Sequence, residues 1–83
     1  MKLYIEFYAS LMAFLPPGSE RFRREISAQP GTTVQQLIVQ YRIPEGQAHI
    51  VLVNGRFVCG EDRLQYALQE NDTLAVWPPV AGG

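Results

Sequence analysis

Few residues of this chain can do chemistry as side chains. Among its 83 residues there are one His, one Cys and eight carboxylate side chains. His49 lacks the companion ligands that a metal site needs, and Cys59 has no neighbouring His or cationic cluster that would favour its thiolate. We therefore expect no metal site and no bound cofactor, and we interpret Cys59 as a small, partly buried residue rather than a sulfur relay.

The chemistry is expected at the end of the chain. The last six residues are Pro78, Pro79, Val80, Ala81, Gly82 and Gly83. Glycines add no packing, so a folded domain does not need them there, and the two prolines stiffen the exit from the domain. Such a thin tail fits a narrow channel of another protein. Its terminal carboxylate is a poor electrophile that needs activation, for example as an acyl-adenylate, so the sequence predicts a carrier whose reactive atom is its own C-terminus.

Composition and charge exclude several classes of function. The net charge of −1 argues against a nucleic-acid binder driven by phosphate attraction. There is no apolar run of membrane-spanning length and no signal-peptide pattern at the N-terminus, and one cysteine permits no intramolecular disulfide. We therefore expect a cytoplasmic protein without a membrane partner. Because the chain carries no phosphate-binding loop, dinucleotide fingerprint or nucleophile elbow, any ATP chemistry must come from a partner.

Hydrophobic periodicity predicts one helix and five strands. Residues 2–8 alternate polar and apolar side chains, as a half-buried strand does. The helix is predicted by apolar residues at i, i+3, i+4 and i+7 after a capping-box pattern, in which Thr32 or Thr33 precedes Gln35 or Gln36 by three residues. In chain order we expect strands over 20–27 as well as 2–8, the helix from 34 to about 42, and strands over 50–53, 56–58 and 73–77.

Three local features refine this prediction. The apolar run Ile50–Val53 is typical of a strand buried on both faces. Asn54-Gly55 predicts a tight hairpin turn, because both residues tolerate positive φ. Residues 61–72 are polar, and we expect Leu64 and Leu68 to be their buried members, in a turn or a short helical piece.

The fold class follows from the element order β-β-α-β-β-β. A lone helix must pack across one face of a mixed sheet of four to five strands, which is an α+β two-layer domain. We expect the β-grasp (ubiquitin-like) arrangement, with the first and last strands paired in the centre. The length supports one domain, which we assign to residues 1–79, followed by a flexible tail over 80–83.

The sequence resembles the MoaD/ThiS sulfur-carrier family over its full length. The resemblance is carried by the helix start Gly31-Thr32-Thr33-Val34, the turn Val53-Asn54-Gly55, the segment Asn71-Asp72-Thr73-Leu74 and the Pro-Pro-Val-Ala-Gly-Gly ending. That ending is similar to the MoaD branch, the small subunit of molybdopterin synthase.

The resemblance implies a reaction cycle in which this chain is a non-catalytic, sulfur-donating subunit. An E1-like enzyme would use ATP and magnesium to adenylate the Gly83 carboxylate, and a sulfur donor protein would convert it to a thiocarboxylate. The tail would then enter the large subunit of a molybdopterin synthase, as part of a heterotetramer. By position in the family, Tyr8, Phe57 and Trp77 match residues that contact the partner together with the tail; the alternative is that these aromatic residues belong to the core.

Other functions remain open at this point. The same activated carboxylate can form isopeptide bonds with lysines, as a ubiquitin-like protein modifier does. The sulfur can also serve thiamine, cysteine or tungsten cofactor synthesis, because the partner enzyme chooses the acceptor. A β-grasp binding module with an accidental Gly-Gly ending is the remaining interpretation.

Overall fold

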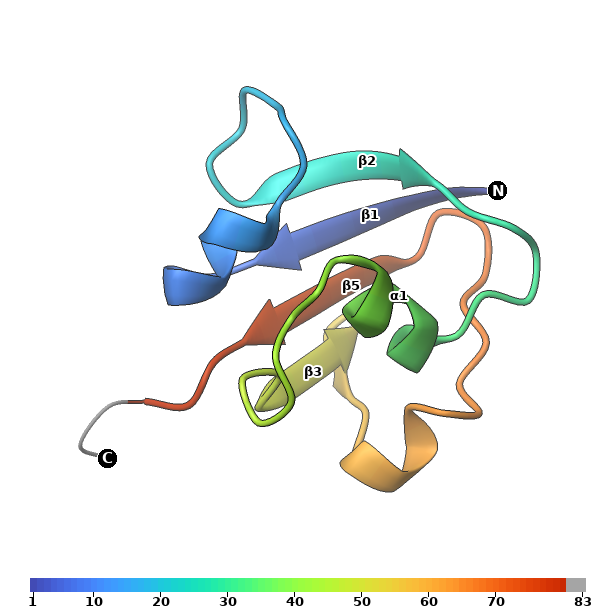
Figure 1. Cartoon of the computed structure of the whole chain (residues 1–83). Helices are drawn as coiled ribbons and strands as arrows, with labels where there is room; N and C mark the ends of the chain where they lie inside the picture. The colour runs from blue at the N-terminus through green and yellow to red at the C-terminus, as the bar shows by residue number, and fades with distance from the viewer. Residues whose placement is uncertain (81–83) are drawn as a thin grey trace.

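A computed structural model describes residues 1–80 of the chain (Figure 1). Its elements are, in order, β1 (Lys2–Phe7), the 3₁₀ helix η1 (Ala9–Phe14), β2 (Arg23–Ser27), α1 (Val34–Gln40), β3 (Ile50–Val53), β4 (Arg56–Phe57), the 3₁₀ helix η2 (Gly60–Asp62) and β5 (Thr73–Trp77). No helix among these residues is long and apolar enough to cross a membrane.

The five strands form one mixed sheet in the order β2-β1-β5-β3-β4. The first and last strands are parallel neighbours at its centre, and the register places Ile5 beside Leu74 and Phe7 beside Val76. The other three pairings are antiparallel. Because α1 packs across one face of this sheet (Figure 1), the structure confirms the α+β, β-grasp prediction.

The helix α1 begins and ends where local chemistry dictates. The Thr33 hydroxyl accepts a hydrogen bond from the Gln36 backbone N–H at 3.2 Å, and the Gln36 side-chain oxygen accepts one from the Thr33 N–H at 2.9 Å. This capping box satisfies two N–H groups that the first helical turn leaves unpaired. Arg42, at φ 62°, then turns the chain out of the helix. The predicted helix is confirmed, with Thr33 rather than Thr32 as its cap.

The core lies between α1 and the sheet. Leu3, Ile5 and Phe7 of β1 are buried against the apolar stripe of the helix, which includes Leu37 and Ile38. Burying such a side chain fully contributes about 1.5–3 kcal/mol. No polar or charged residue among those described is buried, so the side chains that pack between α1 and the sheet are apolar.

Two turns take the backbone conformations that their residues predict. Asn54 and Gly55 have φ of 52° and 83°, the left-handed values of a tight hairpin turn, and they place Val53 opposite Arg56. Asn71 also has a positive φ of 70° just before β5. Asn tolerates this conformation better than most residues.

Three local expectations were wrong or incomplete. Ile50–Val53 is not buried on both faces, because Ile50 is 37% exposed and only Val51 and Val53 are buried. Leu64 is 69% exposed, whereas Leu68 is buried as predicted. The 3₁₀ helix η1, which lies in the connection between β1 and β2, was not predicted at all.

Candidate functional site

The face of the sheet that points away from α1, which we call the outer face, carries most of the candidate site. Side chains alternate across a strand, so the residues between the buried Leu3, Ile5 and Phe7 of β1 lie on this face. In the neighbouring strands the register places Trp77 beside Ile50, and Leu52 between Ala75 and Phe57. We define the outer-face patch as Tyr8, Ile50, Leu52, Phe57 and Trp77.

Tyr8 and Trp77 form an aromatic stack at one end of this patch. Their ring centroids are 3.9 Å apart with an interplanar angle of 5°, and the Phe22 ring lies 5.0 Å from that of Tyr8. Trp77 nonetheless remains 40% exposed. Large aromatic side chains with exposed surface are typical anchors of protein interfaces, so the structure brings together two of the three aromatic residues that we expected at the partner surface.

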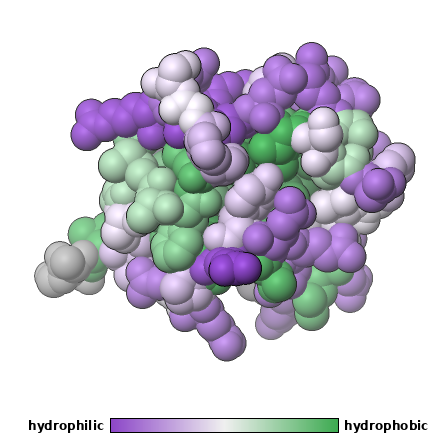
Figure 2. All heavy atoms as spheres, turned by 45° about the horizontal axis from the view of Figure 1, so that its top comes forward, coloured by the Kyte–Doolittle hydropathy of each residue, from purple (hydrophilic) through white to green (hydrophobic). Residues whose placement is uncertain are grey.

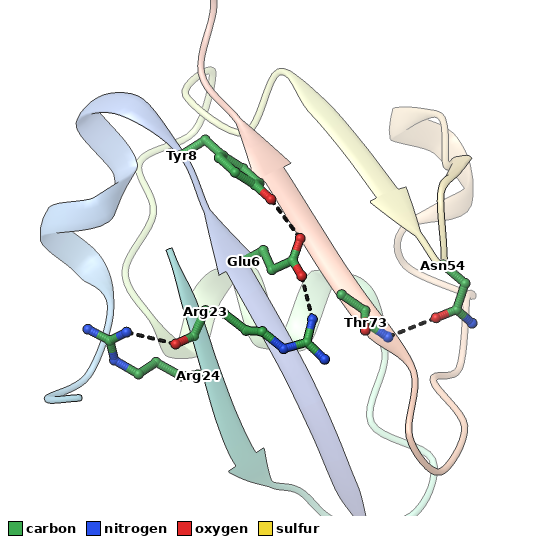
Figure 3. A network of polar contacts seen from close by, with 6 residues as sticks. All are labelled: Glu6, Tyr8, Arg23, Arg24, Asn54 and Thr73. Atoms are coloured by element: carbon green, nitrogen blue, oxygen red, sulfur yellow. Dashed lines mark hydrogen bonds and ion pairs between the residues drawn. The ribbon is translucent and has the colours of Figure 1, made fainter. Parts of the chain in front are cut away.

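A polar network holds the Tyr8 ring in this position (Figure 3). The Tyr8 hydroxyl donates a 2.7 Å hydrogen bond to Glu6 Oε1, and the other Glu6 oxygen forms an ion pair with Arg23 of β2. The bond to Glu6, with burial and the nearby negative charge, raises the pKa of Tyr8 to about 12 from 10.0, and the Arg23 charge opposes this rise. Tyr8 therefore stays a neutral hydrogen-bond donor to Glu6 at neutral pH.

Phe57 lies on the same face but apart from the aromatic stack. It is 63% exposed on the edge strand β4, and Leu52 and Ala75 lie between it and β1. Ile50 and Leu52 lie between Trp77 and Phe57, and the sequence predicted them to be buried rather than part of the site. The sequence could have indicated this exposure. In a fold with one helix, the helix covers one face of the sheet, so an apolar strand such as β3 must expose apolar residues on the other face.

The chain leaves the sheet directly beside the aromatic stack. Hydrogen bonds from both neighbouring segments hold the last residues of β5. The Tyr8 N–H donates to the Val76 carbonyl at 3.1 Å, and the His49 N–H donates to the Trp77 carbonyl at 3.0 Å. Pro78 and Pro79 follow, and Val80 is 75% exposed. Ala81, Gly82 and Gly83 lie outside the described residues. Figure 2 shows hydrophobic residues gathered on the side of the molecule that holds η1 and the end of β5.

The other candidate side chains take no part in this site. Cys59 Sγ donates a hydrogen bond to Asp62 Oδ2 at 3.2 Å, at the start of η2. Within residues 1–80 no three His, Cys, Asp or Glu side chains are grouped as metal ligands. The arrangement places an exposed apolar surface beside the point where the chain leaves the sheet.

Comparison with known proteins defines the class. Residues 5–83 match the model of the ThiS family. The chain is also 33% identical to Small archaeal modifier protein 3 of Haloferax volcanii, over the full length of both proteins. The chain therefore belongs to the ThiS family, which in the wider sense is the ThiS/MoaD group of small sulfur carriers and ubiquitin-like modifiers.

Solved structures share the fold at low sequence identity. SAMP1 from Haloferax volcanii matches with a TM-score of 0.68 and 23% identity, over all of both chains. A chain of the complex of subunits 1 and 2 of molybdopterin-converting factor from Helicobacter pylori matches with a TM-score of 0.59 and 19% identity, again over all of both chains. These likenesses establish the β-grasp architecture.

Proposed function

We propose that this chain is a sulfur carrier for molybdopterin synthesis, whose Gly83 carboxylate is activated and converted to a thiocarboxylate. The observation that carries the proposal is the Gly82-Gly83 ending on a ThiS-family chain. The described part of the tail leaves the sheet beside an exposed aromatic stack. The chain supplies the reactive carboxylate and the docking surface, and partners supply the catalysis.

The chemistry needs two steps on Gly83. In the first, one carboxylate oxygen attacks the α-phosphorus of ATP, and pyrophosphate leaves to give the acyl-adenylate. In the second, a hydrosulfide ion released by a donor protein attacks the activated carbonyl, a C–S bond forms, the bond to the phosphate breaks, and AMP leaves; loss of one proton gives the thiocarboxylate. An E1-like enzyme with magnesium would perform the activation. Because Gly82 and Gly83 have no Cβ, the end of the chain can approach both the E1-like enzyme and the sulfur donor protein closely.

The outer-face patch is the proposed contact with the large subunit of a molybdopterin synthase. Tyr8 and Trp77 would anchor the interface next to the tail, and Phe57 would contact the partner at the other edge of the sheet. The protein from Helicobacter pylori that shares this fold is found in a complex of subunits 1 and 2, which supports such an assembly. A heterotetramer of two small and two large subunits is the form we propose.

The test is a conversion assay with the E1-like partner, ATP and a sulfur source. We expect intact-mass analysis to show one terminal oxygen replaced by sulfur. The matched control is deletion of Gly83, which should abolish conversion and leave the melting temperature unchanged. An unchanged mass of the full chain, with a partner that is active on its own substrate, would refute the proposal.

A second candidate function is supported by the relative named as a modifier protein. The activated Gly83 would then form isopeptide bonds with lysines of other proteins. Trypsin cuts last after Arg63, so the remnant on a modified lysine is the 20-residue segment 64–83 rather than Gly-Gly. An Ala81→Arg variant would leave a Gly-Gly remnant, and finding it on lysines of cellular proteins would favour this function.

The acceptor enzyme that binds the chain would determine whether the sulfur serves thiamine, cysteine or tungsten cofactor synthesis instead. Capture of the large synthase subunit by the purified chain would assign the molybdopterin pathway. Capture of a different acceptor enzyme would assign another pathway and leave the thiocarboxylate chemistry intact.

A further inference from the structure

The turn between β3 and β4 contains a chemically labile pair of residues, Asn54-Gly55. Asparagine side chains are prone to deamidation, most of all before a glycine, because glycine has no Cβ to hinder the approach of its backbone nitrogen to the neighbouring side chain. Asn54 is exposed, so water can reach it. The other asparagine, Asn71, precedes Asp72 rather than a glycine. Asn54 is therefore the asparagine of this chain that is most open to deamidation.

Both polar atoms of the Asn54 side chain are hydrogen-bonded to the chain where β5 begins. Asn54 Oδ1 accepts from the Thr73 N–H at 2.9 Å (Figure 3), and Asn54 Nδ2 donates to Asp72 Oδ1 at 2.8 Å. The other oxygen of that carboxylate accepts from the Gln69 N–H at 2.8 Å, which holds the carboxylate in place. Hydrogen bonds to a charged acceptor are stronger than those between neutral groups, so Asp72 contributes the stronger of the two bonds.

These bonds hold the side chain away from the nitrogen that would attack it. In the sheet β3 lies between β5 and β4. The Asn54 side chain bonds toward β5, whereas Gly55 leads the chain the other way, into β4. The Asn54 N–H also donates to the Thr73 carbonyl at 2.9 Å, so its backbone and its side chain are tied to the same neighbour. Deamidation needs the side chain to swing toward the Gly55 nitrogen, and this movement breaks both side-chain bonds.

We propose that Asn54 is a deamidation site and that Asp72 is the residue that protects it in the folded chain. In the reaction, the Gly55 nitrogen gives its proton to the solvent and attacks Asn54 Cγ, and the new C–N bond closes a succinimide ring. The Cγ–Nδ2 bond breaks, and the amide nitrogen takes up a proton and leaves as ammonia. Water then adds to one of the two ring carbonyls, the ring C–N bond at that carbonyl breaks, and aspartate or isoaspartate remains.

The product cannot restore the original arrangement. A carboxyl group at position 54 has no N–H to donate to Asp72, and once ionised it places a second negative charge beside that carboxylate, where like charges repel. Isoaspartate also adds one methylene to the backbone of a two-residue turn. This turn sets the register that places Phe57 opposite Leu52. Deamidation therefore disturbs the Phe57 edge of the outer-face patch.

The experiment follows Asn54 in the purified full chain, kept at mildly alkaline pH below its melting temperature. Trypsin releases residues 43–56 as one peptide, in which Asn54 is the one asparagine, so mass spectrometry reads its conversion to the acid. A hydrogen bond to a charged group changes an equilibrium by about tenfold or more. We therefore expect the folded chain to deamidate at least about tenfold more slowly than the same chain in concentrated urea. Asp72→Ala should remove most of this protection while circular dichroism still shows a folded chain.

The matched control is Glu70→Ala. It removes a neighbouring carboxylate that accepts from the Lys2 N–H instead, and it should deamidate as slowly as the wild type. If Asp72→Ala does not fold, Asp72→Asn keeps the shape of the side chain, removes its charge and should still react faster than the wild type.

Four results would overturn the proposal. Equal rates for the wild type in buffer and in urea would show that the fold gives no protection, and no reaction in urea would show that Asn54 is not labile. A folded Asp72 variant that reacts as slowly as the wild type would remove the role of Asp72. A Glu70→Ala variant that reacts as fast as Asp72→Ala would assign the protection to charge in general. None of these outcomes depends on the activation of Gly83.

Discussion

The two faces of the sheet use the same strands for different purposes. On the inner face Leu3, Ile5 and Phe7 are buried under α1, whereas on the outer face Phe57 is 63% exposed and Trp77 is 40% exposed. Alternate residues of one strand therefore belong either to the core or to the surface. A chain of 83 residues with one main helix can cover only one face of the sheet, so apolar side chains on the other face are available to a partner.

This difference separates stability from recognition. Inner-face residues contribute to folding through burial, and their loss leaves a cavity. Outer-face residues contribute less to folding, because much of their surface is in water in the isolated chain. Substitutions on the inner face should therefore change the free energy of unfolding, whereas substitutions on the outer face should mainly change the affinity for a partner.

The largest effect is expected on the inner face, from Leu37→Ala in α1. Leu37 is fully buried, so the truncation should lower the free energy of unfolding by about 2–5 kcal/mol. Urea denaturation followed by circular dichroism measures this loss. A destabilisation below about 1 kcal/mol, within the range of ordinary surface changes, would contradict the assignment of α1 to the core.

On the outer face, Trp77→Ala should weaken binding of the proposed partner, the large synthase subunit, by about 2 kcal/mol or more, as loss of an aromatic anchor does. The fold should be less affected, since the stacking with Tyr8 is worth about 0.5–1.5 kcal/mol. Isothermal titration calorimetry measures the affinity. The matched control is Val39→Ala, an exposed apolar residue of α1, which should bind normally; equal losses for both variants would remove the distinction between the faces.

A smaller effect is expected at the cap of α1. Thr33→Ala removes the side chain that accepts from Gln36 N–H and should lower stability by about 1 kcal/mol. Gln36→Ala keeps that bond and removes the reciprocal one, so it should cost less. Chemical denaturation of the two variants side by side makes the comparison, and a larger loss for Gln36→Ala would show that the cap is assigned to the wrong residue.

The smallest effect concerns pH. The pKa of Tyr8 is raised to about 12, first by the hydrogen bond to Glu6 and then by burial. Because the folded chain holds this proton more tightly than the unfolded one, the associated stability is fully present below pH 10 and is lost as pH rises toward about 12. Ultraviolet titration of tyrosinate should show this late step.

Two variants check the assignment of that step. Tyr8→Phe should remove the late titration step, and Glu6→Gln should lower the pKa of Tyr8 back toward 10. Tyr41, whose pKa is also raised by burial, serves as the internal reference. A late step that survives Tyr8→Phe would assign it to another tyrosine and leave the Glu6 network without its proposed role.

Local patterns predicted the inner face well. The alternation of residues 2–8, the capping residues before α1 and the Asn54-Gly55 turn each act over a few residues, so the sequence alone specifies them. The order of elements then indicated the β-grasp arrangement. The aromatic candidates Tyr8 and Trp77 were named from family position, and the structure shows that they stack.

The errors arose where tertiary structure decides. Whether Ile50 and Leu52 are covered depends on how many layers the sheet has, which four residues of an apolar strand do not reveal. The helix η1 begins at Ala9 with φ 53°, a conformation that Ala rarely favours and that no turn residue announces. Leu64 and Leu68 lie in a segment with few local signals, and only packing determines that Leu68 is buried as predicted and Leu64 is exposed.

The central claim is that the chain acts through its terminal carboxylate. In this account the inner face of the sheet stabilises the fold, and the outer face binds the partner that receives the tail. Intact-mass analysis of the full chain after incubation with its E1-like partner, ATP and a sulfur source tests this most directly. The account predicts replacement of one Gly83 oxygen by sulfur and no conversion after deletion of Gly83. Conversion that persists in the deletion variant, or none in the full chain, would contradict it.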